Sequence, residues 1–271
     1  HLSLRRQRQM CIRDRSMTLI VANIYDGDRI AMASDTLVTW DPGARMATPG
    51  TDELGKIVIA RPLVAIGISG YDPHSRIRDV VAMREEPLGE IIAMLEQDSH
   101  AGFVVASLDP LRLVVIDSGT VSDRTEIGQA WSGDISAYST YQRKFQTEWV
   151  GKKEQPVPFR QMTALQWQTS FDVNPNVGGR TLRVSGGHGD AFHFLADQTM
   201  SLGSDDRTVF LVGVGRTPGA YGFFDENRGV GGLFRHEMPD VPVEVAASTL
   251  SEFQRKAQQD YSQEIAYARA W

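Results

Sequence analysis

Residues 17–36 read MTLIVANIYDGDRIAMASDT, which is the most informative stretch of the chain. Two apolar runs, 18–25 and 28–34, flank an Asp-Gly pair. Asp-Gly between two such runs is a strong signal for a β-hairpin, because both residues tolerate the positive φ angles of a tight turn. We therefore predict an antiparallel hairpin whose first strand begins at Thr18.

Strand groups and helix groups alternate along the rest of the chain. The predicted strands cover 57–60, 63–69, 103–108, 111–116, 124–131, 180–184, 191–195 and 209–214. The predicted helices cover a pair at about 74–97, then 138–149, 159–171 and 250–265. Residues 35–54 are predicted to form a long loop. Several strands are joined as hairpins, so the sheets should be mostly antiparallel. Helix pairs between strand groups favour an architecture in which helices cover two stacked sheets.

The first sixteen residues differ from the rest of the chain. They hold five of the 28 Lys and Arg residues and one of the 34 Asp and Glu residues, so without them the net charge changes from −6 to −10. Their string RQRQMCIRDR resembles translated sequencing-adapter read-through, and we interpret residues 1–16 as a non-native leader. A basic RNA-binding arm and a targeting segment are the alternatives.

Residues 17–271 are predicted to form a single domain. Their acidic charge, without a basic stripe, argues against nucleic acid as a partner. No apolar run approaches the roughly 18 residues that a membrane span needs. The only cysteine, Cys11, lies in the leader, so we expect no disulfide, no thiolate metal site and no cysteine nucleophile in the domain. A soluble cytoplasmic protein is the resulting expectation.

Thr18 is a candidate nucleophile if it becomes the first residue of the protein. A threonine hydroxyl is a weak nucleophile and must lose its proton during attack. A free α-amine has a pKa of about 7.7–8.0 and can take that proton. Met17 before Thr18 is a junction that an aminopeptidase can clear, which would expose the amine.

Four further residues supply, in chain order, the groups that such a nucleophile needs. Asp35 follows the second strand of the hairpin, which returns towards Thr18, and Lys56 begins the next strand pair. A lysine assists the hydroxyl electrostatically, and an aspartate holds the lysine in position. Gly70 ends that strand pair, where its N–H is placed to meet an oxyanion. Ser132 lies at a strand-to-helix junction, where serine also serves as an ordinary helix cap.

This ordered set resembles the N-terminal half of a proteasome β-type subunit and of the related bacterial ATP-dependent protease core. Both belong to the N-terminal nucleophile (Ntn) hydrolases. The matching pieces cover about residues 18–150, and the fourteen-residue step from Lys56 to Gly70 agrees with the family spacing. The resemblance implies an α+β fold, a four-layer αββα sandwich with mostly antiparallel sheets.

The resemblance also implies a chemistry, that of a proteasome-like threonine protease. Thr18 would be the nucleophile and, through its α-amine, the base, while Lys56 would be the electrostatic activator and Asp35 its partner. The N–H of Gly70 would be the oxyanion donor, and Ser132 would support the amine. A peptide or amide substrate and a ring-shaped homo-oligomer are implied as well, but no particular ATPase partner is indicated.

The second half departs from the family pattern. The family has Asp-x-x-Ser-Gly, and the nearest segment here runs from Asn174 through Val177 to Gly178, with Asp172 as an alternative acid. In this register one acidic partner of the amine is missing. Two alternatives therefore stay open: a catalytically silent subunit of the same fold, with a structural or interaction role, and an Ntn amidase acting on a small amide.

No cofactor and no metal site are predicted. His188, Asp190 and His193 are expected to lie in a hairpin turn and the strand after it. The glycine-rich run 213–219 has the wrong spacing for a dinucleotide loop, and its Pro-Gly pair does not start a helix.

Overall fold

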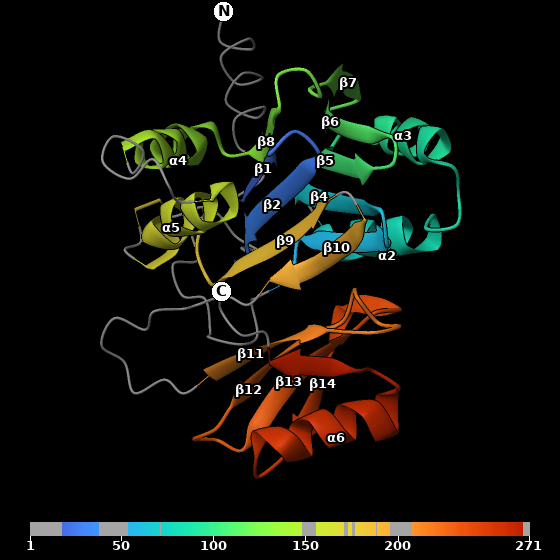
Figure 1. The fold of residues 1–271 in the computed structure, drawn as a ribbon, viewed down its shortest axis with the longest axis vertical. Coiled ribbons are helices and arrows are strands. Elements are labelled where there is room, and N and C mark those ends of the chain that lie inside the picture. The colour runs from blue at the N-terminus through green and yellow to red at the C-terminus, as the bar shows by residue number, and fades with distance from the viewer. Residues whose placement is uncertain are drawn as a thin grey trace, which may run out of the picture.

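The computed structural model describes residues 18–37, 54–70, 72–147, 156–170, 173–174, 177–187, 189–195 and 208–267. Over these ranges the chain is a mixed α+β protein with three antiparallel sheets and five helices (Figure 1). The leader 1–16, the alternative acid Asp172 and most of the predicted loop 35–54 lie outside the described residues.

The first sheet is built around the predicted hairpin, which the structure confirms. Its strand order is β10-β9-β2-β1-β8, with β1 at Leu19–Tyr25, β2 at Arg29–Asp35, β8 at Gln129–Gly133, β9 at Thr181–Gly187 and β10 at Asp190–Leu195. Asp26 and Gly27 in the turn have φ angles of 52° and 86°, as the Asp-Gly signal requires. The strand β1 is therefore flanked by β2 on one side and β8 on the other.

The second sheet is a meander in the order β3-β4-β5-β6-β7. Its strands are β3 (Ile57–Arg61), β4 (Val64–Gly70), β5 (Ala101–Leu108), β6 (Leu111–Asp117) and β7 (Thr120–Asp123). The two predicted hairpins in this region are confirmed, but the strand predicted at 124–131 is wrong in its bounds. Residues 125–128 form a turn in which the Gly128 N–H bonds to the Arg124 carbonyl, and β8 begins only after it.

The two sheets pack face to face, with helices outside both (Figure 1). Helices α2 (Pro73–Ala82) and α3 (Leu88–Glu96) lie on the second sheet, and α4 (Ile135–Thr147) and α5 (Val157–Ser170) lie on the first. Alternate residues of β1 face opposite sides: Ile20 joins the core between the sheets, whereas Leu19 and Val21 pack against Tyr141 of α4. The helix pair predicted at 74–97 is confirmed.

A third sheet follows in the last sixty described residues. Its order is β14-β13-β12-β11-β15, with β11 at Thr208–Gly213, β12 at Tyr221–Asp225, β13 at Val230–Arg235, β14 at Met238–Ala246 and β15 at Ile265–Tyr267. One face packs on α6 (Leu250–Tyr261) through Leu211 and Phe253, and the other adds Phe210 and Tyr221 to the main core.

Four strands of this sheet were not predicted. Glycine weakens strand propensity, and β12 and β13 carry three glycines, which hides the pattern. The structure explains one of them, because a Cβ on Gly231 would lie 2.5 Å from the ring of Phe253. The helix predicted at 250–265 is also too long: Ser262, at φ 57°, ends α6, and Ile265 belongs to β15.

None of the described helices is both long and apolar enough to cross a membrane.

Candidate active site

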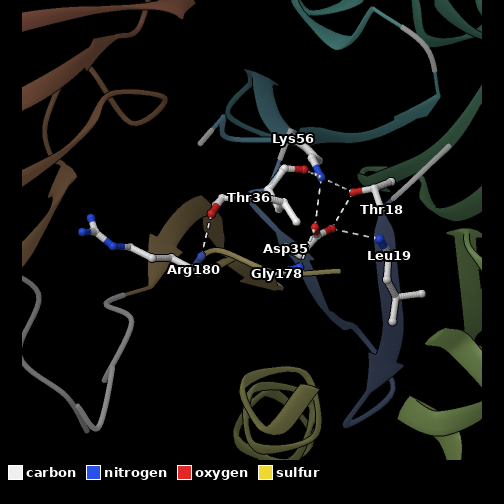
Figure 2. Close-up of polar contacts among 8 residues, drawn as sticks. Thr18, Leu19, Asp35, Thr36, Lys56, Gly178 and Arg180 are labelled. Carbon is white, nitrogen blue, oxygen red and sulfur yellow. Dashed lines mark hydrogen bonds and ion pairs between the residues drawn. The ribbon is translucent and has the colours of Figure 1, made fainter. Parts of the chain in front are cut away.

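Thr18 lies immediately before β1, an inner strand of the first sheet, and is only 3 % exposed. Its backbone carbonyl accepts a hydrogen bond of 2.8 Å from the N–H of Asp134, at the end of β8. Its side chain lies on the side of β2 and of the segment before β3 (Figure 2). The residue is thus held by the strands on both sides of β1.

The hydroxyl of Thr18 contacts both of the predicted charged residues. It donates to Asp35 Oδ1 at 2.5 Å and accepts a hydrogen bond from Lys56 Nζ. Lys56 also donates to Asp35 Oδ2 at 3.0 Å and to the carbonyl of Leu37 at 2.5 Å (Figure 2). An ammonium has three donors and no acceptor, so these three partners fit the charged form of the lysine.

The carboxylate of Asp35 is fully buried, and both of its oxygens are occupied. Besides Thr18 and Lys56, it accepts from the backbone N–H of Leu19 at 2.9 Å and from that of Gly178 at 3.4 Å. A buried ion pair is tolerated only when further hydrogen bonds satisfy its remaining lone pairs, and these backbone donors do so. Asp35 therefore holds Lys56 in one place and orients the hydroxyl.

Burial lowers the pKa of Lys56 below its ordinary value of 10.5, and the charge and hydrogen bond of Asp35 oppose that shift. A strongly desolvated lysine with a specific charged partner is a functional-site candidate, since such groups are costly to keep in a core. The lysine can therefore place a positive charge beside the hydroxyl oxygen of Thr18 in surroundings that screen it weakly.

Three neighbouring elements fix the backbone that carries Lys56. Its carbonyl accepts from the N–H of Ile68 on β4 at 2.8 Å, and the N–H of Leu54 donates to the carbonyl of Thr36 at 2.8 Å. Gly55 packs so closely on the third sheet that a Cβ there would lie 2.0 Å from the hydroxyl oxygen of Tyr221. All three sheets thus contribute to the position of one side chain.

Ser132 is a predicted site residue for which the structure shows a different contact. It lies on β8 directly opposite Ile20, and its Oγ is 2.7 Å from the Oγ of Ser69 on β4. Ser69 donates in turn to the carbonyl of Gly102 at 3.1 Å. Among the described residues no hydrogen bond joins Ser132 to Thr18, and its support of a free α-amine stays a prediction.

Gly70 ends β4, as the sequence predicts, but its role is not visible in the contacts. It pairs with Ala101 and has a φ angle of 123°. A Cβ at this position would lie 2.9 Å from the Ala101 Cα, so a close approach and a left-handed backbone both require glycine. Within the described part of the chain, Gly70 makes no hydrogen bond to Thr18.

The segment that departs from the family pattern lies beside the site. Asn174 donates to Ser136 Oγ at 2.7 Å and to Asp134 Oδ1 at 3.4 Å, at the start of α4. Val177 is buried against the Leu19 side of the first sheet, and Gly178 donates to Asp35. The segment therefore contacts the start of α4 through Asn174 and the carboxylate of Asp35 through Gly178.

Several contributing groups were missed from the sequence. The carbonyl of Leu37 and the N–H groups of Leu19 and Gly178 are backbone atoms, which leave no residue-type signal. The one available clue is that a buried ammonium must find three acceptors, of which Thr18 and Asp35 supply only two.

Neither a comparison with protein-family models nor a comparison with curated proteins finds a match to this chain.

We predict that Gly133→Ala disturbs the site more than Gly27→Ala does. Both glycines have positive φ angles, 117° and 86°, so alanine is strained at either position. The added Cβ of Gly133 would lie 2.1 Å from the Thr18 carbonyl oxygen, whereas that of Gly27 meets nothing within 4 Å. Gly27→Ala should cost roughly 1–2 kcal/mol in urea unfolding, and Gly133→Ala clearly more. Equal losses would contradict the close approach at Thr18.

Proposed function

We propose that this chain is an N-terminal threonine hydrolase with the αββα sandwich of the Ntn hydrolases, and that it cleaves amide bonds in peptides. The observation that carries the proposal is the hydrogen-bonded set of Thr18, Asp35 and Lys56, buried at the end of the first sheet. The layer order in Figure 1 supports it: α4 and α5, then the first and the second sheet, then α2 and α3. We further propose that residues 17–271 act as one domain and that copies assemble into a homo-oligomeric ring.

The proposed reaction needs the α-amine of Thr18, which is a peptide nitrogen while Met17 precedes it. Once it is free, the amine takes the hydroxyl proton as Oγ forms a bond to the substrate carbonyl carbon. The C–N bond of the substrate then breaks, and the leaving amine takes that proton. An ester on Thr18 remains. Water attacks its carbonyl carbon, the C–O bond to Thr18 breaks, a carboxylic acid is released, and the Thr18 hydroxyl is regenerated.

Lys56 and Asp35 have separate parts in this sequence. The ammonium of Lys56 touches the hydroxyl oxygen, so it stabilises the negative charge that develops there as the proton leaves. Asp35 is hydrogen-bonded to both Thr18 and Lys56 and holds the two side chains next to each other. Such preorganisation needs no movement of the protein at the moment of reaction.

The second candidate is a catalytically silent subunit with the same fold. It is favoured by the neutral Asn174 and the apolar Val177, because neither can act as an acid or donate a hydroxyl to the amine. The third, an amidase acting on small amides, uses the same three residues with a different substrate.

A combined experiment separates the three candidates. The chain is expressed from Met17, its intact mass is measured, and it is incubated with a peptide library and an acyl-amide library. Loss of Met17 with peptide cleavage supports the proposed function, and loss of Met17 with turnover of acyl amides alone supports the amidase. A retained Met17 with no turnover of either library supports the silent subunit and overturns the proposal.

The pH dependence of kcat/KM should be bell-shaped. Activity should rise as the α-amine loses its proton, near its ordinary pKa of about 7.7–8.0. It should fall again on the alkaline side before pH 10.5, because the pKa of Lys56 lies below that value and its loss of charge removes the stabilisation of the hydroxyl oxygen. The measurement is a pH series with circular dichroism at each point. A flat alkaline side in folded protein would contradict the role of Lys56.

A further inference from the structure

The proposed function leaves the site with an unbalanced charge, and the following inference rests on that function. A freed Thr18 places an α-ammonium beside the ammonium of Lys56, with Asp35 as the carboxylate already hydrogen-bonded to Lys56 and the hydroxyl. The two cations would repel each other, and a single carboxylate would balance only one of them. Water screens this repulsion poorly, because Thr18, Asp35 and Lys56 are all nearly or fully buried. A second anion on the amine side would correct this.

Asp134 lies in the right place to be that anion. The pairing of β1 with β8 ends with Leu19 opposite Gly133, and the next residue, Asp134, donates its N–H to the Thr18 carbonyl at 2.8 Å. Asp134 is therefore the acidic residue that the β1–β8 pairing brings to Thr18 from the side away from Asp35.

The carboxylate of Asp134 is also held in a fixed orientation. Its Oδ1 accepts from the N–H groups of Ser136 and Ala137, both at 2.8 Å, and from the Ser136 hydroxyl at 2.5 Å. These contacts make it the N-cap of α4, and the positive end of the helix favours its charged form. Its charge is thus fixed on the α4 side of Thr18.

Asn174 completes the arrangement. Its amide nitrogen points at Asp134 Oδ1 and at Ser136 Oγ, at 3.4 and 2.7 Å. A neutral amide that donates to Asp134 supports the carboxylate, whereas a second carboxylate in this position would repel it. The neutral Asn174 and the acidic Asp134 are therefore complementary.

We propose that Asp134 is the anionic positioning residue for the α-amine of Thr18, with Asn174 as its neutral hydrogen-bond partner. The charged groups that act on the amine are then Asp35 from β2, Lys56 from the segment before β3, and Asp134 from the β8–α4 junction. Asp134 offsets the repulsion from Lys56 and orients the amine towards the hydroxyl.

The test moves the carboxylate by mutation from position 134 to position 174, on the other side of the Asp134–Asn174 contact. Proteins with Thr18 as first residue carry Asp134→Asn, or Asp134→Asn together with Asn174→Asp, which returns the carboxylate to the same contact. Asp72→Asn is the control, because Asp72 is also a helix N-cap: it belongs to α2 and accepts the Ser75 N–H at 3.3 Å. Asparagine caps helices about as well as aspartate, so thermal unfolding should change little in all three variants.

Two readouts are measured. The first is kcat and KM for a peptide substrate, and Asp134→Asn should lower kcat roughly 10–100-fold with KM little changed. The second is the titration midpoint of the ¹³C-methylated α-amine by NMR, made in the Thr18→Ala background so that it is independent of turnover. Asp134→Asn should move this midpoint to lower pH, the double variant should restore it, and Asp72→Asn should leave it unchanged.

An unchanged midpoint in Asp134→Asn overturns the inference, since a residue that only caps α4 would give that result. A midpoint that the double variant fails to restore overturns it as well. Failure of the proposed function gives a different result, because protein without any hydrolysis would still show the shifted and restored midpoints.

Discussion

Thr18→Ala should abolish peptide hydrolysis, with kcat/KM falling by about 10⁴-fold or more. The substitution removes the nucleophile but leaves Lys56 bonded to Asp35 and to Leu37, and leaves the Asp35 carboxylate bonded to Leu19. The free energy of unfolding should therefore fall by only about 1–3 kcal/mol, the cost of one buried hydroxyl with its hydrogen bonds. Steady-state kinetics and urea unfolding of the same preparation measure both effects.

Two controls accompany this variant. Thr18→Ser keeps the hydroxyl and should keep measurable activity. Thr36→Ala removes another buried threonine hydroxyl, which accepts from the Arg180 N–H at 2.7 Å, and should cost stability without abolishing hydrolysis. Normal activity in Thr18→Ala would exclude Thr18 as the nucleophile.

Lys56→Met should reduce both activity and stability. The carboxylate of Asp35 would remain fully buried without its cation, and breaking a buried pair in this way costs about 3–5 kcal/mol. The hydroxyl of Thr18 would also lose the positive charge that stabilises it during attack, which should lower kcat about 10²–10³-fold. Urea unfolding and single-turnover kinetics report the two losses separately.

The double variant Asp35→Asn with Lys56→Met distinguishes charge burial from catalysis. Removing both charges removes the uncompensated carboxylate, so most of the lost stability should return. Activity should stay low, because the electrostatic stabilisation is still absent. A double variant that regains activity together with stability would show that Lys56 serves only the fold.

The sequence predicts well those features that depend on local pattern. The Asp-Gly turn placed β1 and β2, and the order of Thr18, Asp35 and Lys56 along the chain anticipated residues that meet in space. Apolar runs and helical spacing were sufficient for most of the first two sheets. The polar strand β7 was not predicted, and the bounds of β8 were wrong.

Features that depend on tertiary contacts could not be predicted in the same way. The third sheet was hidden by glycines such as Gly231 that make room for Phe253. The backbone donors to Asp35 and the carbonyl of Leu37 have no residue-type signature. Ser132 was predicted at a strand-to-helix junction and lies near the end of β8, but its hydroxyl contacts Ser69, because β8 faces β4 across the core between the sheets.

The third sheet has a consequence for the site as well as for the fold. Tyr221 stacks on Phe234 with ring centroids 4.4 Å apart and occupies the space that a side chain on Gly55 would need. The residue after Gly55 is Lys56. The C-terminal part of the chain therefore supports the lysine, although the sequence resemblance covered only the first half.

Reaction with a peptide epoxyketone tests in one step whether the hydroxyl and the α-amine of Thr18 act together. The Thr18 hydroxyl adds to the ketone of the reagent and the Thr18 amine opens its epoxide. The cyclic adduct therefore forms only if both groups are free. We expect a single adduct on the peptide that begins with Thr18, with a mass increase equal to the reagent, and none after the amine has been acetylated. Absence of the adduct in protein from which Met17 has been removed would exclude Thr18 as an N-terminal nucleophile.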